Sequence, residues 1–148
     1  MKTMTLILER LRTAQPPQTN PLRPLIPGTP PPAQLPLNPI AFLTAAIDSV
    51  APILRIKALK GVAGGGAALQ VPVPMNLRQR RRAAFIWILE AAEKRADRGL
   101  RNRMANKIAD ELIAVVEGKS GVWDRRQGLH KSGVSARANL KTRRRGRR

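Results

Sequence analysis

The sequence predicts a mainly α fold, a helical bundle from which a two-stranded β-hairpin protrudes. Apolar residues recur at helical spacing in residues 39–51, 80–95 and 100–117, which supply the bundle. Residues 54–60 and 69–73 alternate in character on either side of the glycines 64–66, which indicates a hairpin at about 54–74. We therefore expect one helical domain over residues 39–140.

Two helices of this domain have clear boundaries. Asn38 is placed to cap the first, Pro39 suits its first turn, and Pro52 ends it. Gly118 ends the last of the strongly periodic helices. The residues expected to face the core are Ile40, Leu43, Ile47 and Val50 in the first helix and Leu100, Met104, Ile108, Leu112 and Val115 or Val116 in the last. The middle helix, with Phe85, Trp87, Ile88 and Leu89, is apolar most of the way round, so we expect other elements to surround it.

Three segments lie outside this domain. Residues 1–14 predict a short amphipathic helix, which is favoured over a mitochondrial transit peptide because the segment has the acidic Glu9 and no serine. A cationic membrane-surface helix is another alternative, against which the acids of the long helix and a tryptophan expected to be buried elsewhere argue. Residues 15–38 are Pro-rich and predict an extended insert. Its leucines favour a strap that covers its own domain or a neighbour over a ligand for an SH3-type domain. Residues 141–148 predict a disordered basic tail.

Charge indicates the kind of partner. The chain has 28 Lys and Arg against 9 Asp and Glu, a net charge of +19, and 21 of those 28 cations lie in residues 76–148. Most are arginines, whose guanidinium groups pair bidentately with phosphate, so a polyanion is expected. Aromatic residues make up only 3% of the chain, which argues against base stacking and for recognition of folded RNA through its backbone and shape.

The residues that would support catalysis are nearly absent. There is no cysteine and only one histidine, so no metal site, cofactor or small-molecule substrate is expected. Asp110 and Glu111 are adjacent and diverge around a helix, and His130 has no acid or nucleophile nearby to form a relay. Gly64 to Gly66 precede a strand and lack the Lys-Ser/Thr of a P-loop. No apolar run is long enough to span a membrane. We expect a protein that is not an enzyme.

The order of motifs resembles a known family. A helix that ends at Pro52, a basic hairpin that contains Gln70-Val-Pro-Val73, then Arg80 and the run Trp87-Ile-Leu-Glu-Ala-Ala92 are similar to the universal small-subunit ribosomal protein of the seventh family, bacterial type. The resemblance continues through Arg103-Met-Ala-Asn106 to His130-Lys131 and covers about residues 38–138. It implies a protein of the subunit head that binds the 3′ major domain of small-subunit rRNA. It also implies neighbouring ribosomal proteins as partners, and exit-site tRNA and mRNA near the hairpin.

The resemblance also implies which side chains face nucleic acid. These residues are Lys57, Lys60, Arg80, Lys94, Arg95, Arg125, Arg126, His130 and Lys131. Arg78, Arg81 and Arg82 are added on charge alone, because the family pattern is less uniformly basic at those positions. A non-ribosomal basic protein that coats nucleic acid, mainly through its tail, is the alternative.

Departures from the family pattern suggest a compartment. Met4 to Thr13 resembles only the end of the family's second helix, so we expect its basic arm and first helix to be missing from this chain. The Pro-rich insert, a longer hairpin tip and the arginine-rich end resemble fungal mitochondrial versions. This favours the mitochondrial matrix over a bacterial cytoplasm.

Overall fold

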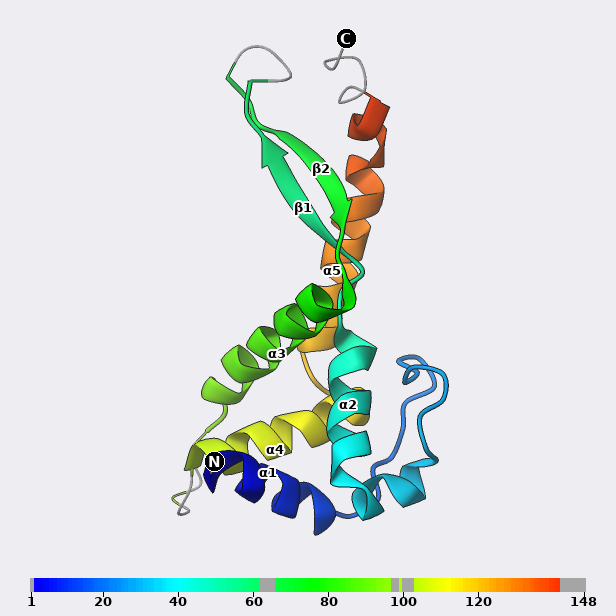
Figure 1. Ribbon diagram of the computed structural model, residues 1–148, viewed down its shortest axis with the longest axis vertical. Coiled ribbons are helices and arrows are strands. Elements are labelled where there is room, and N and C mark those ends of the chain that lie inside the picture. Colours follow the sequence, from blue (N-terminus) through cyan, green and yellow to red (C-terminus); the bar gives the residue numbers. More distant parts are fainter. Residues whose placement is uncertain (1, 62–65, 97–98, 100–102, 142–148) are drawn as a thin grey trace.

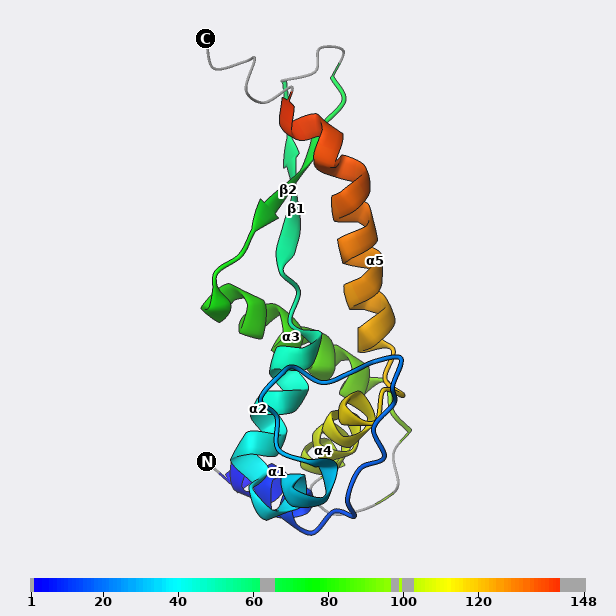
Figure 2. The same ribbon diagram turned by 90° about the vertical axis from the view of Figure 1, so that its right-hand side faces the viewer.

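The structure, a computed structural model, describes residues 2–61, 66–96, 99 and 103–141. Four helices form the body at one end, and a hairpin rises from it alongside a fifth helix (Figures 1 and 2). The body contains α1 (Lys2–Arg12), α2 (Pro39–Val50), α3 (Leu77–Glu93) and α4 (Arg103–Val116). The hairpin pairs β1 (Leu54–Leu59) with β2 (Leu69–Pro74), and α5 (Val122–Ser135) runs beside it. Two short 3-10 helices, η1 (Pro32–Leu37) and η2 (Ala136–Ala138), complete the described elements. The predicted fold class is confirmed.

The core lies where α1, α2, α3 and α4 meet. In α2, Val50 is fully buried as predicted, and Leu43 and Ile47 pack against the core. The prediction for Ile40 is wrong, because its side chain is 66% exposed whereas Phe42 is fully buried with Ala45 and Ala46. Two apolar stripes were available on this helix. The one with two alanines is buried because small side chains let the helix backbone approach its neighbours closely, and the Phe42 ring then fills the remaining space.

Helix α4 buries one face, which includes Ala105, Ile108 and Leu112. The prediction for Met104 is wrong, since its side chain is 39% exposed, and Leu100 lies outside the described residues. Gly118 ends the helix as predicted. It has a φ of +71°, and the amide of Lys119 donates to the carbonyl oxygen of Ala114 at 2.8 Å.

Helix α3 begins at Leu77, three residues before the predicted start. Asn76 and Gln79 form a capping box in which each side chain accepts from the backbone amide of the other residue. The buried stripe of α3 is narrow, and Phe85 and Ile86 are 40% and 41% exposed. Helices α2, α4 and α5 pack against α3, as expected, but they leave Phe85 and Ile86 partly exposed.

The Pro-rich insert is partly helical, because η1 occupies its end, and it packs on the body through the fully buried Leu35. Arg23 ties the insert to the turn between α4 and α5. Its guanidinium donates to the carbonyl oxygen of Gly118 at 2.9 Å and pairs with Asp124 at 2.5 Å. Part of the insert remains uncovered by the described residues, since Leu22 is 89% exposed.

The hairpin is antiparallel, with Leu54 opposite Pro74 and Leu59 opposite Leu69. Its predicted turn falls largely on residues 62–65, which lie outside the described residues. Helix α5 approaches the base of the hairpin closely at Gly133, where an added Cβ would lie 2.7 Å from a methyl carbon of Leu54. None of the helices described is long and apolar enough to cross a membrane.

Candidate nucleic-acid interface

The residues predicted to contact nucleic acid lie on three elements, α3, α5 and β1, or directly after the end of one of them. Residues of α3 and α5 face one another near the base of the hairpin, and the hairpin lysines lie further out along β1 (Figure 1). The structure divides them into basic side chains that are paired with acids and basic side chains that are not.

Arg80, Arg126 and His130 form one group, called here the junction cluster. The Arg80 Nε donates to the carbonyl oxygen of Pro52 at 3.1 Å, and the Ile53 amide donates to the His130 Nε2 at 3.1 Å. These two hydrogen bonds fix the connection between α2 and β1, and therefore the direction in which the hairpin leaves the body. Because Nε2 accepts a hydrogen bond, this imidazole is neutral and carries its proton on Nδ1.

The junction cluster concentrates positive charge. Burial lowers the pKa of Arg126, and the nearby Arg80 lowers it further. Burial also lowers the pKa of His130, with smaller contributions from Arg126 and Arg80. The Nε of Arg126 is buried without a hydrogen-bond partner among the described residues, and neither arginine forms an ion pair with a described carboxylate. An anion placed here would relieve the repulsion between these groups.

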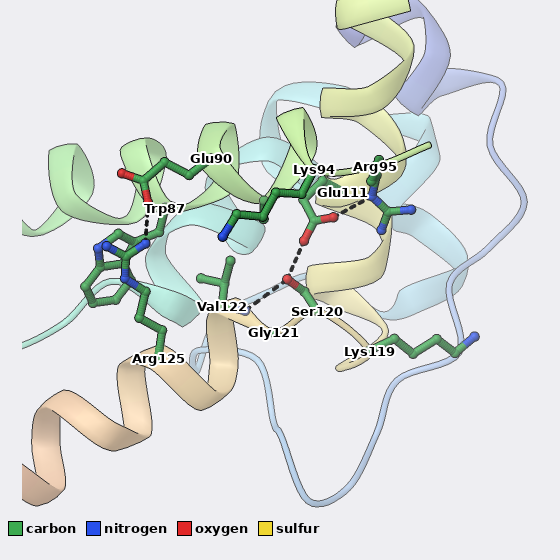
Figure 3. A pocket seen from close by; sticks show the side chains of 11 residues that line it. Trp87, Glu90, Lys94, Arg95, Glu111, Lys119, Ser120, Gly121, Val122 and Arg125 are labelled. Atoms are coloured by element: carbon green, nitrogen blue, oxygen red, sulfur yellow. Dashed lines mark hydrogen bonds and ion pairs between the residues drawn. The ribbon is translucent and has the colours of Figure 1, made fainter. Parts of the chain in front are cut away.

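A pocket of about 410 Å³ lies between the end of α3 and the start of α5 (Figure 3). Arg95 and Glu111 pair at 2.5 Å along one wall, and the Ser120 hydroxyl also donates to Glu111. On the opposite wall, Arg125 pairs with Glu90 at 2.5 Å and lies 4.9 Å from the centre of the Trp87 ring.

Lys94 lines the same pocket but has no ion-pair partner among the described residues. In Figure 3 its side chain reaches across the pocket between these two walls. The three basic residues that the sequence placed together here therefore differ: Arg95 and Arg125 hold helices together, and Lys94 is available to an external anion.

The arginines at the start of α3 divide in the same way. Arg81 makes a bidentate pair with Asp48 of α2, with both N–O distances at 2.7 Å, and this carboxylate raises its pKa. Arg78 and Arg82 are exposed and make no ion pair with any carboxylate that the structure describes. Nothing in the local sequence distinguishes Arg81 from these two neighbours.

The remaining predicted residues are exposed lysines. Lys57 lies on β1 opposite Val71, Lys60 follows the last residue of that strand, and Lys131 lies on α5. Arg55 was missed, although it is exposed and lies two positions before Lys57 on the same strand. The two-residue period of a strand would have found it.

Two structural roles had no sequence signal. Glu111 is 4% exposed and holds both Arg95 and Ser120, and Arg23 joins the insert to α5. Their partners are distant along the chain, so only the folded arrangement identifies them.

A basic helical body with a projecting hairpin and unpaired cations on several elements has the character of a polyanion-binding protein. Residues 7–137 match the family Ribosomal protein S7p/S5e, and the chain belongs to that family. Its resemblance to this family is thereby confirmed. Family membership also agrees with the expectation that the chain is not an enzyme.

Relatives of this chain come from fungi and bacteria. The chain is 52% identical over 140 residues to "Small ribosomal subunit protein uS7m" of Neurospora crassa, an alignment that covers 94% of this chain and 45% of that protein. It is 33% identical over 101 residues to "Small ribosomal subunit protein uS7" of Burkholderia cenocepacia, covering 68% of this chain and 60% of that protein. The chain thus spans about half the length of the curated relatives it matches.

Proposed function

We propose that this chain is a structural component of the head of the small ribosomal subunit, where it binds the 3′ major domain of small-subunit rRNA. Neighbouring ribosomal proteins are further partners, and the hairpin contributes to the region of the exit-site tRNA and the mRNA exit path. Membership of the Ribosomal protein S7p/S5e family supports this role. The 52% identity to the fungal protein uS7m supports a place in the mitochondrial ribosome, in the matrix.

The observation that carries the proposal is the distribution of charge along α3. Its first turn contains no acid, and Arg78, Arg80, Arg81 and Arg82 follow its N-terminal cap. The N-terminus of a helix is the positive end of its dipole, so a cation in the first turn, such as Arg78, is unfavourable by a few tenths of a kcal/mol. Of these four residues, Arg81 alone has a described carboxylate as an ion-pair partner. Phosphates of rRNA would neutralise the others.

The mechanism is electrostatic and does not involve catalysis. Unpaired cations on α3, α5 and β1 neutralise phosphates where several rRNA helices converge, and every neutralised phosphate releases counterions. The paired cations keep these elements in fixed relative positions. The His130 and Arg80 hydrogen bonds then orient the hairpin relative to that surface.

The proposal is tested by the binding preference of the purified chain at about 0.15 M salt, an ionic strength at which generic attraction is weakened. We expect the chain to prefer the 3′ major domain of small-subunit rRNA to an arbitrary duplex of equal length. The same measurement on a chain truncated after Leu140 should show weaker binding and the same preference.

Two results would contradict this proposal. Equal affinity for the rRNA domain and the arbitrary duplex would contradict the proposal that this surface binds rRNA specifically. Loss of all binding on removal of residues 141–148 would instead favour a protein that coats nucleic acid through its tail. A tagged chain should also co-sediment with the mitochondrial small subunit, and exclusion from those particles would refute the proposed location.

A further inference from the structure

Three of the four aromatic side chains of this protein are enclosed or covered. Phe42 is fully buried, Trp123 is 7% exposed, and Arg125 lies over the ring of Trp87. Phe85 differs, since it is 40% exposed on the surface of α3. Phe85 is thus the most exposed of the four rings, and its surroundings indicate what could cover it.

Phe85 belongs to a stripe along one flank of α3, which we call the α3 flank: Arg78, Arg82, Phe85 and Leu89. Successive members are four, three and four residues apart, so they lie one above another on the helix. Trp87 and Arg80, which face α5, lie on the opposite flank. The α3 flank therefore points away from the pocket of Figure 3.

The charges on this flank are unbalanced around the ring. Arg82 lies one turn from Phe85 and Arg78 about one turn further, and neither forms an ion pair with a described carboxylate. Glu93 is exposed but lies eight residues beyond Phe85, which is about 12 Å along a helix. Arg81, which also lies one turn before Phe85, is already paired with Asp48 of α2, so Arg78 and Arg82 are the cations beside the ring that lack a described carboxylate partner.

An unpaired nucleotide has the chemistry that fits this flank. Its base offers a flat face that stacks on an aromatic ring, and its phosphates lie within reach of guanidinium groups a helical turn away. If an apolar surface of another protein covered this flank instead, both arginines would be removed from water without an ion-pair partner. We infer that Phe85 stacks on an unpaired rRNA base whose adjacent phosphates pair with Arg82 and Arg78.

This inference rests on the proposed rRNA binding and adds one specific contact to it. The low aromatic content predicted that the chain recognises RNA through its backbone and shape. A single exposed ring at Phe85 leaves that prediction in place for the rest of the RNA-binding surface. It allows a single stacked nucleotide and excludes a continuous track of stacked bases.

The test is chemical probing of nucleotide flexibility in the 3′ major domain rRNA bound to the full chain. Phe85→Leu keeps an apolar helix former and removes the ring, Phe85→Trp restores a ring, and Ile86→Leu changes the neighbouring exposed residue as a control. We expect Phe85→Leu to weaken binding about 5-fold or more and to expose one unpaired nucleotide while the rest of the footprint persists. Phe85→Trp and Ile86→Leu should keep that nucleotide protected.

The outcomes separate this inference from the function on which it rests. An unchanged footprint and affinity for Phe85→Leu would overturn the stacking contact while leaving rRNA binding intact. Normal RNA binding with weaker incorporation into particles would also overturn it, by assigning the ring to a protein neighbour. If the unaltered chain gives no footprint on this RNA, the proposed function itself fails.

Discussion

Adjacent residues of like charge, Lys94 and Arg95, should respond to alanine substitution in opposite ways. Arg95 neutralises the Glu111 carboxylate, whose side chain is 5% exposed, whereas Lys94 is exposed and has no described ion-pair partner. Arg95→Ala leaves this carboxylate with the Ser120 hydroxyl as its hydrogen-bond donor among the contacts of the described residues. Arg95→Ala should therefore lower the stability of the fold, whereas Lys94→Ala should lower the affinity for RNA.

The magnitude follows from the exposure of the two partners. A hydrogen bond to a charged group contributes about 1.5–3 kcal/mol, and stranding a buried charge adds to the loss. Because the Arg95 side chain is itself 33% exposed, solvent screening weakens the stabilisation by the Arg95–Glu111 pair. We therefore expect Arg95→Ala to lower the free energy of unfolding by about 2 kcal/mol. For a chain of this size that corresponds to a fall in Tm of roughly 6 °C. Lys94→Ala should change stability by less than about 0.5 kcal/mol.

Urea and thermal unfolding, followed by circular dichroism and tryptophan fluorescence, measure both effects on the chain without RNA. Replacing Glu111 by Leu as well as Arg95 by Ala removes the stranded charge, so the double variant should be more stable than Arg95→Ala alone. The reasoning is refuted if Arg95→Ala and Lys94→Ala are equally stable, or if the second substitution lowers stability further.

Three other substitutions or conditions have defined outcomes. Because His130 has a lowered pKa in the folded chain, stability should be constant above about pH 7.5 and fall as the pH drops through about 6.5 towards the folded pKa, since the unfolded chain takes up the proton first. Denaturant titrations of His130→Gln should lose this dependence, and an unaltered pH profile would contradict the assignment. Gly133→Ala should be less stable than Gly128→Ala on the same helix, because the added methyl forces the Leu54 side chain to shift, whereas Gly128 has open space and its substitution should be neutral or stabilising. Equal unfolding midpoints for these two variants would argue against close packing of α5 on β1. Gly118→Ala should lower stability by at least about 1 kcal/mol, because φ is +71° and the methyl would meet the insert, and a neutral result in the same assay would exclude that contact.

The parts of the fold that were predicted correctly depend on local sequence. Alternation on either side of a glycine run identified the hairpin, and Gly118 identified the end of α4. The start of α3 was also encoded locally, in the Asn76 and Gln79 capping box, but it was predicted three residues too late. The burial of Phe42 in place of Ile40 was not predictable in this way, because it depends on which helices pack against α2.

The candidate interface shows the same limit. Composition and spacing identified the cations, but the carboxylates that neutralise some of them come from other elements. Arg81 pairs with Asp48 across 33 positions of the chain, and Arg95 pairs with Glu111 across 16. Sequence could therefore predict that the surface is basic, while the division into structural and available cations required the fold.

The central claim is that unpaired cations, and not net charge alone, bind rRNA. It is tested most directly by how the affinity for the 3′ major domain rRNA depends on salt in two variants with equal loss of charge. Arg78→Ala with Arg82→Ala removes unpaired cations, and Arg10→Ala with Lys119→Ala removes exposed cations that pair with Asp110 and Glu117. We predict that the slope of log K against log salt becomes less steep by about 1.5–2 in the first variant and is nearly unchanged in the second. Equal changes in both variants would contradict the claim.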